Sequence, residues 1–119
     1  MQLSTIDSAL DALRAGKPVL VADSADRENE GDAIISAELV SPEWMAWMVK
    51  HTTGFLCAPM EDGKANELEL PLMTTDNQDP HGTNYTITVD AAARESTGVS
   101  ASDRALTART LASNSSGPE

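Results

Sequence analysis

The chain has 119 residues, of which 40% are hydrophobic and only 3% aromatic, which suits one domain with an aliphatic core. Its 19 acidic and 8 basic residues give a formal net charge of -11, which excludes nucleic acid and anionic membranes as partners because both need a basic surface. The single cysteine, Cys57, rules out an internal disulfide and indicates a cytoplasmic protein. Asp7 and Asp11 interrupt the first apolar run, so neither a signal peptide nor a membrane span is expected.

The first predicted element is a helix over residues 4–15, where apolar side chains recur at helical spacing. Ser4 and Asp7 resemble a capping box at its start, and Gly16 follows its end. The short run "PVLVAD", residues 18–23, then predicts a strand that is buried on both faces.

Residues 33–39 predict a second strand. A second helix is expected within 41–54, with Ser41 as its N-cap and a proline in its first turn. A third strand is predicted at 55–59, and a short helix within 61–70.

Proline, aspartate, asparagine and glycine predict a loop at residues 71–84. Residues 85–91 alternate apolar and polar side chains, which indicates a half-exposed strand. The last predicted helix, 100–113, has Ser100 or Ser102 as its cap. Because strands and helices mix without strict alternation, the predicted fold class is α+β, a mixed α/β sheet with flanking helices.

Residues 22–35, "ADSADRENEGDAII", place a dense acidic cluster between two apolar runs. A solvated surface turn is the ordinary explanation of such a cluster. A ligand site is favoured because the loop follows the carboxyl end of a buried-looking strand and contains Gly31, which permits close backbone approach. In an extended segment, Glu28, Glu30 and Asp32 would also point the same way. Such a row of carboxylates predicts an oxygen-ligated Mg²⁺ or Mn²⁺.

An EF-hand is excluded by the spacing of these residues. If Gly31 takes the sixth position of the calcium loop, Ala37 stands at the position where a bidentate glutamate is required.

Five segments together resemble the 3,4-dihydroxy-2-butanone 4-phosphate synthase family: "DRENEGD" at 26–32, "GFLCAP" at 54–59, "LPLM" at 70–73, "HGTNYTITVDA" at 81–91 and "TGVSASDRALTAR" at 97–109. Residues 1–119 are therefore interpreted as one domain that resembles the N-terminal portion of the synthase domain. The resemblance implies an α+β fold and a homodimer with active sites at the subunit interface. It also implies a lyase of riboflavin biosynthesis, which converts ribulose 5-phosphate to 3,4-dihydroxy-2-butanone 4-phosphate and formate with Mg²⁺ or Mn²⁺.

The resemblance further implies individual roles. Glu28 would bind the metal, and Glu30 and Asp32 would bind metal waters or transfer protons. These residue types suit the reaction, because a proton must leave carbon three of the ketose and a dication stabilises the charge that develops. Cys57, which matches a cysteine lining the pocket, would join Glu30 and Asp32 as a catalytic residue. Arg27 would meet the substrate phosphate, and Asp23 would touch sugar hydroxyls. The other implied substrate contacts are Thr83, Thr97, Ser100 and Arg104, the last of which with Asp103 matches an Asp-Arg pair of the family.

Family members continue beyond these segments with stretches like "RPGHVFPL" and "GHTEA", which supply a metal-binding histidine and a catalytic glutamate. Relative to them the chain looks truncated, so an exposed sheet edge and apolar faces are expected, covered by a partner or another copy. A catalytically impaired fragment, a non-enzymatic interaction module and a general divalent-metal binder are the alternatives. His51 is expected to interact with the last carbonyls of its helix, His81 is the better functional candidate, and Cys57 is expected to be a small buried hydrophobe.

Overall fold

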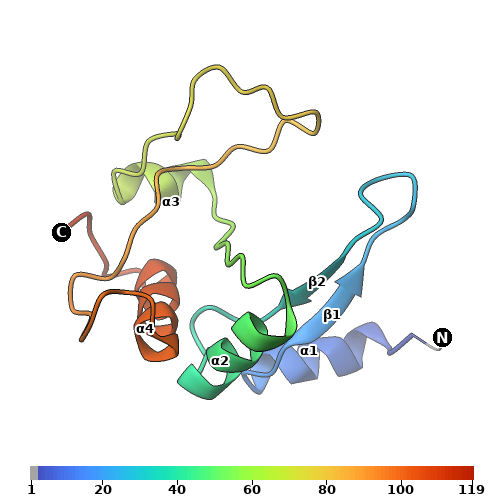
Figure 1. Ribbon diagram of the computed structural model, residues 1–119. Helices are drawn as coiled ribbons and strands as arrows, with labels where there is room; N and C mark the ends of the chain where they lie inside the picture. The colour runs from blue at the N-terminus through green and yellow to red at the C-terminus, as the bar shows by residue number, and fades with distance from the viewer. Residues whose placement is uncertain (1–2) are drawn as a thin grey trace.

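A computed structural model describes residues 3–119. The elements in chain order are α1 (Ile6–Arg14), β1 (Val19–Ala22), β2 (Gly31–Ile34), α2 (Pro42–His51), α3 (Asp62–Glu67) and α4 (Ala101–Ala112). α1 lies along one small antiparallel hairpin, and α2 packs with α4. A long loop runs out from α3 and returns to α4 (Figure 1). The α+β fold class is confirmed. In the described part of the chain, no helix combines the length and apolar character needed to cross a membrane.

Local capping sets where the main helices begin. The Thr5 hydroxyl accepts the N–H three residues on at 3.2 Å and starts α1, so the predicted cap at Ser4 is wrong by one residue. Ser41 caps α2 as predicted, and Ser100 rather than Ser102 caps α4, each accepting an N–H at 3.1 Å. The short helix predicted within 61–70 is confirmed as α3.

The core lies between α2 and α4. Met45 of α2 is 5% exposed and packs with Val40 against Ala105 of α4, which is fully buried. Because alanine is small, the two helices can approach closely at this point. Arg109 then ties α4 to the start of α2, since its Nη1 donates to the Val40 carbonyl at 2.7 Å. Partly buried side chains complete the cluster: Ile35, Trp44, Leu56, Ala101 and Ala108.

The hairpin is shorter and more exposed than predicted. β1 pairs antiparallel with β2 from Val19 opposite Ile34 to Ala22 opposite Gly31. The expectation that the first strand is buried on both faces is wrong, because Leu20 is 78% exposed. The second strand was predicted at 33–39, but β2 ends at Ile34 and residues 37–39 form a turn.

The other two predicted strands are not paired strands within the described residues. Residues 55–59 form no ladder with any described segment. Residues 85–91 contribute only a single bridge, between Thr86 and Leu72. The loop predicted at 71–84 is confirmed, apart from that bridge. A strand needs a neighbouring strand with which to form a ladder, and the described chain places none beside these two segments.

Much apolar surface remains open to solvent. The radius of gyration is 15.4 Å, compared with about 13.5 Å for a compact domain of this length. The accessible surface is 8937 Å², compared with about 6,200 Å² for a folded monomer of this mass. Phe55 is 70% exposed and Val99 64% exposed. Apolar exposure on this scale ordinarily marks an interaction surface.

The position of the core predicts a contrast between two substitutions of apolar residues. Met45→Ala should lower the free energy of unfolding by about 2–5 kcal/mol, because it opens a cavity between α2 and α4. Leu20→Ala should change it by no more than about 0.5 kcal/mol, because that side chain is already solvated. Urea unfolding followed by circular dichroism measures both, and equal losses would contradict this assignment of the core.

Candidate functional site

The acidic loop joins β1 to β2 and is organised by Asp23. The Glu30 N–H donates to Asp23 Oδ1 at 2.7 Å, and the Glu28 N–H donates to Oδ2 at 3.0 Å. The Asp23 N–H in turn donates to the Glu30 carbonyl at 3.2 Å. These donors, the Glu30 N–H first, lower the pKa of the Asp23 carboxyl. Asp23 therefore holds the loop that carries the predicted metal ligand.

The three carboxylates of the loop do not form the row that an extended segment would give. Residues 25–28 form a turn, and Asn29 has a φ of 54°, in the left-handed region. The backbone thus changes direction between Glu28 and Glu30, and only Asp32 lies on β2. The segment is therefore not extended, and the condition for the predicted common orientation of these side chains is not met. The loop is a hairpin connection, not the end of a strand in an open sheet.

Arg27 neutralises two carboxylates of its own loop. Its Nε donates to Asp23 Oδ2 at 2.9 Å, and its Nη2 donates to Glu28 Oε2 at 3.3 Å. The bond to Asp23 is the main cause that raises the pKa of Arg27. Because the side chain stays 62% exposed, these ion pairs are weak and the guanidinium can exchange partners.

The acidic loop offers fewer ligands than a divalent cation needs. Among residues 3–119, no three side chains of His, Cys, Asp or Glu come close enough together to hold a metal ion. Glu28 offers carboxylate oxygens, which suit Mg²⁺. The described residues alone therefore provide only part of a coordination shell.

Cys57 is exposed rather than buried, which corrects the expectation from sequence. Partial covering of the thiol, followed by the negative charge of Asp32, raises its pKa. The thiol is therefore protonated at neutral pH and is a poor nucleophile. The influence of Asp32 also means that the structure brings these two predicted site residues near each other.

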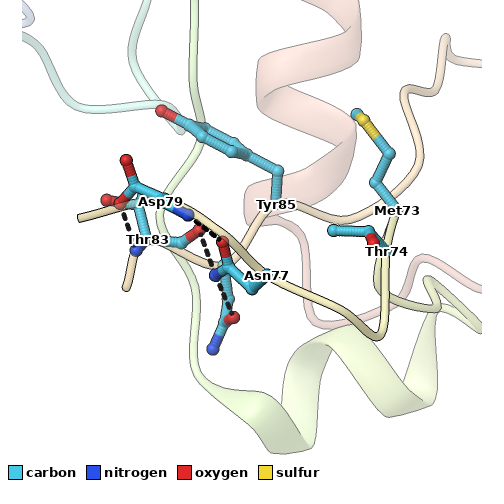
Figure 2. Close-up of a pocket in the computed structure, with 7 residues that line it drawn as sticks. Met73, Thr74, Asn77, Asp79, Thr83 and Tyr85 are labelled. Atoms are coloured by element: carbon cyan, nitrogen blue, oxygen red, sulfur yellow. Dashed lines mark hydrogen bonds between the residues drawn. The ribbon is translucent and has the colours of Figure 1, made fainter. Parts of the chain in front are cut away.

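A second group surrounds a cavity of about 120 Å³ in the loop between α3 and α4 (Figure 2). Asp79 Oδ2 accepts the N–H groups of Thr83 at 2.8 Å and His81 at 3.2 Å, and the Thr83 N–H is the main cause that lowers the pKa of Asp79. Asn77 Nδ2 donates to the Thr83 carbonyl at 3.0 Å. The lining residues are Met73, Thr74, Asn77, Asp79, Thr83, Asn84 and Tyr85.

Sequence reasoning missed Asp79 and Asn77. The Asp79 N–H donates to Asn77 Oδ1 at 2.9 Å, which is an Asx turn. The Asn-x-Asp spacing was the available signal, because asparagine and aspartate bind backbone groups two residues on. These side chains fix the backbone on which the predicted substrate contact Thr83 stands.

The two histidines have modest roles in the described structure. The His51 ring lies against Trp47, with ring centroids 5.2 Å apart. Thr52, not His51, donates to the Met48 carbonyl at 2.6 Å, so the expected contact of His51 with the last carbonyls is wrong. His81 donates its backbone N–H to Asp79.

A third group lies at the start of α4 and is organised by Asp103, which is only 1% exposed. Asp103 Oδ1 accepts the Glu95 N–H at 2.8 Å, and Oδ2 accepts the N–H groups of Ser96 at 3.2 Å and Gly98 at 3.1 Å. The Ser96 hydroxyl also donates to Oδ2. This hydroxyl first, and then the Glu95 N–H, lower the pKa of Asp103 to about 2.

The predicted substrate contacts of this group are held by the same turn. Gly98 has a φ of +88°, and a Cβ there would lie 2.5 Å from the Asp90 carboxylate, so the turn requires glycine. Thr97 is exposed between the two anchored residues. The Ser100 hydroxyl is used as the helix cap, and Arg104 Nε donates to the Val99 carbonyl at 2.8 Å.

The predicted site residues thus fall into separate groups. Asp23, Arg27, Glu28 and Glu30 share the acidic loop, with Asp32 and Cys57 at its exit. Thr83 lies on the long loop, and Thr97, Ser100 and Arg104 lie at the start of α4, on the opposite side of the molecule from the hairpin tip (Figure 1).

Comparison with known proteins identifies the family. Residues 7–119 match the family 3,4-dihydroxy-2-butanone 4-phosphate synthase. The chain belongs to this family. It is 49% identical to the synthase of Candida albicans over 114 residues, which are 96% of this chain and 56% of that protein. It is 52% identical to the riboflavin biosynthesis protein RibBA of Salinispora arenicola, covering 96% of this chain and 27% of that protein. The chain therefore spans about half, or less, of the length of these relatives.

Solved structures agree with this assignment. A crystal structure of a synthase in complex with two magnesium ions has a TM-score of 0.93 and 45% identity, and covers 98% of this chain and 54% of that one. The cation-free form of a synthase has a TM-score of 0.87 and 42% identity, covering 98% and 53%. The backbone arrangement of hairpin, helices and long loop is thus shared with the matched part of these synthase structures.

The low pKa of Asp103 predicts a pH-dependent contribution to stability. Because the folded value of about 2 lies below the ordinary 3.8, the ionised carboxylate stabilises the fold above about pH 4, and this contribution is lost as the pH falls toward about 2. Asp103→Asn should be less stable at neutral pH and should show a flatter dependence over this range. Asp26→Asn, at an exposed loop position, should keep the wild-type slope in denaturation curves. Identical slopes for wild type and Asp103→Asn would refute the assignment.

The interaction between Asp32 and Cys57 predicts a change in thiol reactivity. Asp32→Asn removes a negative charge that raises the pKa of the thiol, so alkylation by iodoacetamide at about pH 8 should become faster. Glu38→Gln makes the same charge change outside the loop and should leave the rate unaltered. Mass spectrometry over time measures both rates.

Proposed function

We propose that the chain carries the acidic-loop part of a lyase that converts ribulose 5-phosphate to 3,4-dihydroxy-2-butanone 4-phosphate and formate in riboflavin biosynthesis. The main support is the loop itself, in which the family segment at 26–32 is folded around the Asp23 carboxylate. The names of the relatives point to the same product and pathway. The protein acts in the cytoplasm, in keeping with its single unpaired cysteine.

Each carboxylate of the loop has a different part in this proposal. Asp23 receives two backbone N–H groups and Arg27, so it sets the loop conformation as well as reaching toward sugar hydroxyls. Glu30 and Asp32 accept and return the proton that leaves the ketose. Cys57 is a protonated thiol that lines the pocket beside Asp32.

Glu28 is proposed as one ligand of Mg²⁺ or Mn²⁺, with further ligands from water or another polypeptide. When bound, the cation would supply positive charge next to the ketose oxygens. The magnesium complex of the similar synthase structure supports Mg²⁺ as the first choice. Without added positive charge, an acidic loop in a chain of net charge -11 would repel a sugar phosphate.

The phosphate group of the substrate needs positive charge, which we assign to the arginines of the site. Arg27 is exposed and holds its carboxylate partners only weakly, so it can turn to a phosphate. Thr83, Thr97, Ser100 and Arg104 are the other proposed contacts. Because the start of α4 and the hairpin tip lie on opposite sides of the molecule (Figure 1), we propose that groups from two copies meet in a homodimer.

The proposed reaction is tested by formate release from ribulose 5-phosphate in the presence of Mg²⁺ or Mn²⁺. We expect formate above the blank, lost on chelation, and reduced by Glu30→Gln about 10²-fold or more because a general base is removed. Glu38→Gln makes the same charge change outside the loop and should retain wild-type activity. A folded chain that releases no formate with either metal would count against lyase activity of this chain and favour the interaction module.

A further inference from the structure

The tip of the long loop, residues 74–84, holds its own conformation. Within residues 3–119, every hydrogen bond of this segment joins two of its own residues. The Met73 N–H donates to the Tyr85 carbonyl at 2.8 Å and closes the base of the tip. Since no other described element bonds to the tip, its conformation depends on the side chains that it contains.

The side chain of Asn77 joins the two arms of the tip. Its Nδ2 donates to the Thr83 carbonyl at 3.0 Å and to Asn84 Oδ1 at 3.1 Å, while its Oδ1 accepts the Asp79 N–H at 2.9 Å (Figure 2). The backbone partners determine which amide atom is which, because the Asp79 N–H can only donate and the Thr83 carbonyl can only accept. These contacts need a donor and an acceptor on one short side chain, and an ionised aspartate supplies only the acceptor.

Thr83 is held at both of its backbone groups. Its carbonyl accepts Asn77 Nδ2, and its N–H donates to Asp79 Oδ2 at 2.8 Å. Because threonine is branched at Cβ, a fixed backbone leaves its side chain few rotamers. Thr83 lines the cavity of Figure 2 together with Met73 and Tyr85. The contacts of Asn77 therefore limit the directions in which Thr83 can present its hydroxyl to a ligand.

We propose that Asn77 is a positioning residue, which orients Thr83 for contact with the sugar phosphate substrate. The inference rests on the proposed function, in which Thr83 is a substrate contact, and it adds a residue that acts only through Thr83. Because Thr83 binds the substrate and transfers no proton, loss of the contacts of Asn77 should weaken binding of the substrate and of the transition state alike. Such a change raises KM and leaves kcat unaltered.

Two amide-to-carboxylate substitutions at adjacent positions form a matched test. Asn77→Asp keeps the size of the side chain and the bond from the Asp79 N–H, but it removes both donor contacts. Gln78→Glu makes the same charge change at an exposed side chain, whose hydrogen bond in the described structure is to Asp76 Oδ2 at 3.5 Å. Formate release with Mg²⁺ over a range of ribulose 5-phosphate concentrations gives KM and kcat for each variant.

We expect Asn77→Asp to raise KM at least about fivefold and to keep kcat within about twofold of the wild-type value. Gln78→Glu should match the wild type in both constants. Destabilisation alone would lower the folded fraction, and hence the apparent kcat, without raising KM. An unaltered KM in Asn77→Asp, or an equal rise in Gln78→Glu, would overturn the proposal.

A double-mutant cycle determines whether Asn77 acts through Thr83. In the Thr83→Ala background, Asn77→Asp should change KM by less than about twofold, because the side chain that it orients is already absent. An effect of Asn77→Asp that is as large without the Thr83 side chain as with it would assign Asn77 a different role and overturn the proposal.

Hydrogen exchange measures the same contact without the reaction. In Asn77→Asp, the Thr83 amide should exchange at least about fivefold faster, whereas the Ala105 amide of α4 should keep its rate. Unchanged exchange of Thr83 would overturn the inference. An active chain with an unaltered KM in Asn77→Asp would overturn the inference alone, whereas a wild-type chain that releases no formate would overturn it together with lyase activity of this chain.

Discussion

Hydrogen bonds from backbone N–H groups to aspartate carboxylates hold the loops that carry the predicted site residues. Asp23 binds the acidic loop, Asp79 binds the turn that carries Thr83, and Asp103 binds the turn that carries Thr97. The hairpin supplies the only named strands of the described residues. Because named strands are so few, loops of this length need other hydrogen bonds to hold their conformation. Each carboxylate satisfies backbone donors that secondary structure leaves unpaired, and in return those donors favour its ionised form.

This arrangement changes how the acidity of the chain is interpreted. Part of the negative charge serves to fix backbone, and it is already compensated by N–H dipoles, as in the buried carboxylate of Asp103. Glu28 and Glu30 each donate their N–H to Asp23, and Glu28 Oε2 in turn accepts an N–H of Arg27.

The sequence predicted local features better than distant ones. Ser41, Ser100 and the short helix α3 follow from residues within a few positions of each other, so capping rules identify them. The strands predicted at 55–59 and 85–91 depend on pairing with distant residues, which apolar alternation alone does not specify. Family motifs identified the acidic loop, but not its shape, because a single residue in the left-handed region, Asn29, keeps the segment from being extended. Asp79 was not predicted from the sequence, because its carboxylate acts on the structure by accepting backbone N–H groups.

The packing divides the described chain into two parts. α1 packs on β1 and β1 pairs with β2, whereas the principal core joins α2 to α4, with Ile35 leading from the hairpin into that core. Unfolding of such a molecule need not be a single cooperative event, since the hairpin with its acidic loop can open while the helix pair remains intact. A ligand of the loop would then shift a local equilibrium rather than the global one. Its stabilising effect would be seen in the exchange of hairpin amides before it altered the melting of the helices.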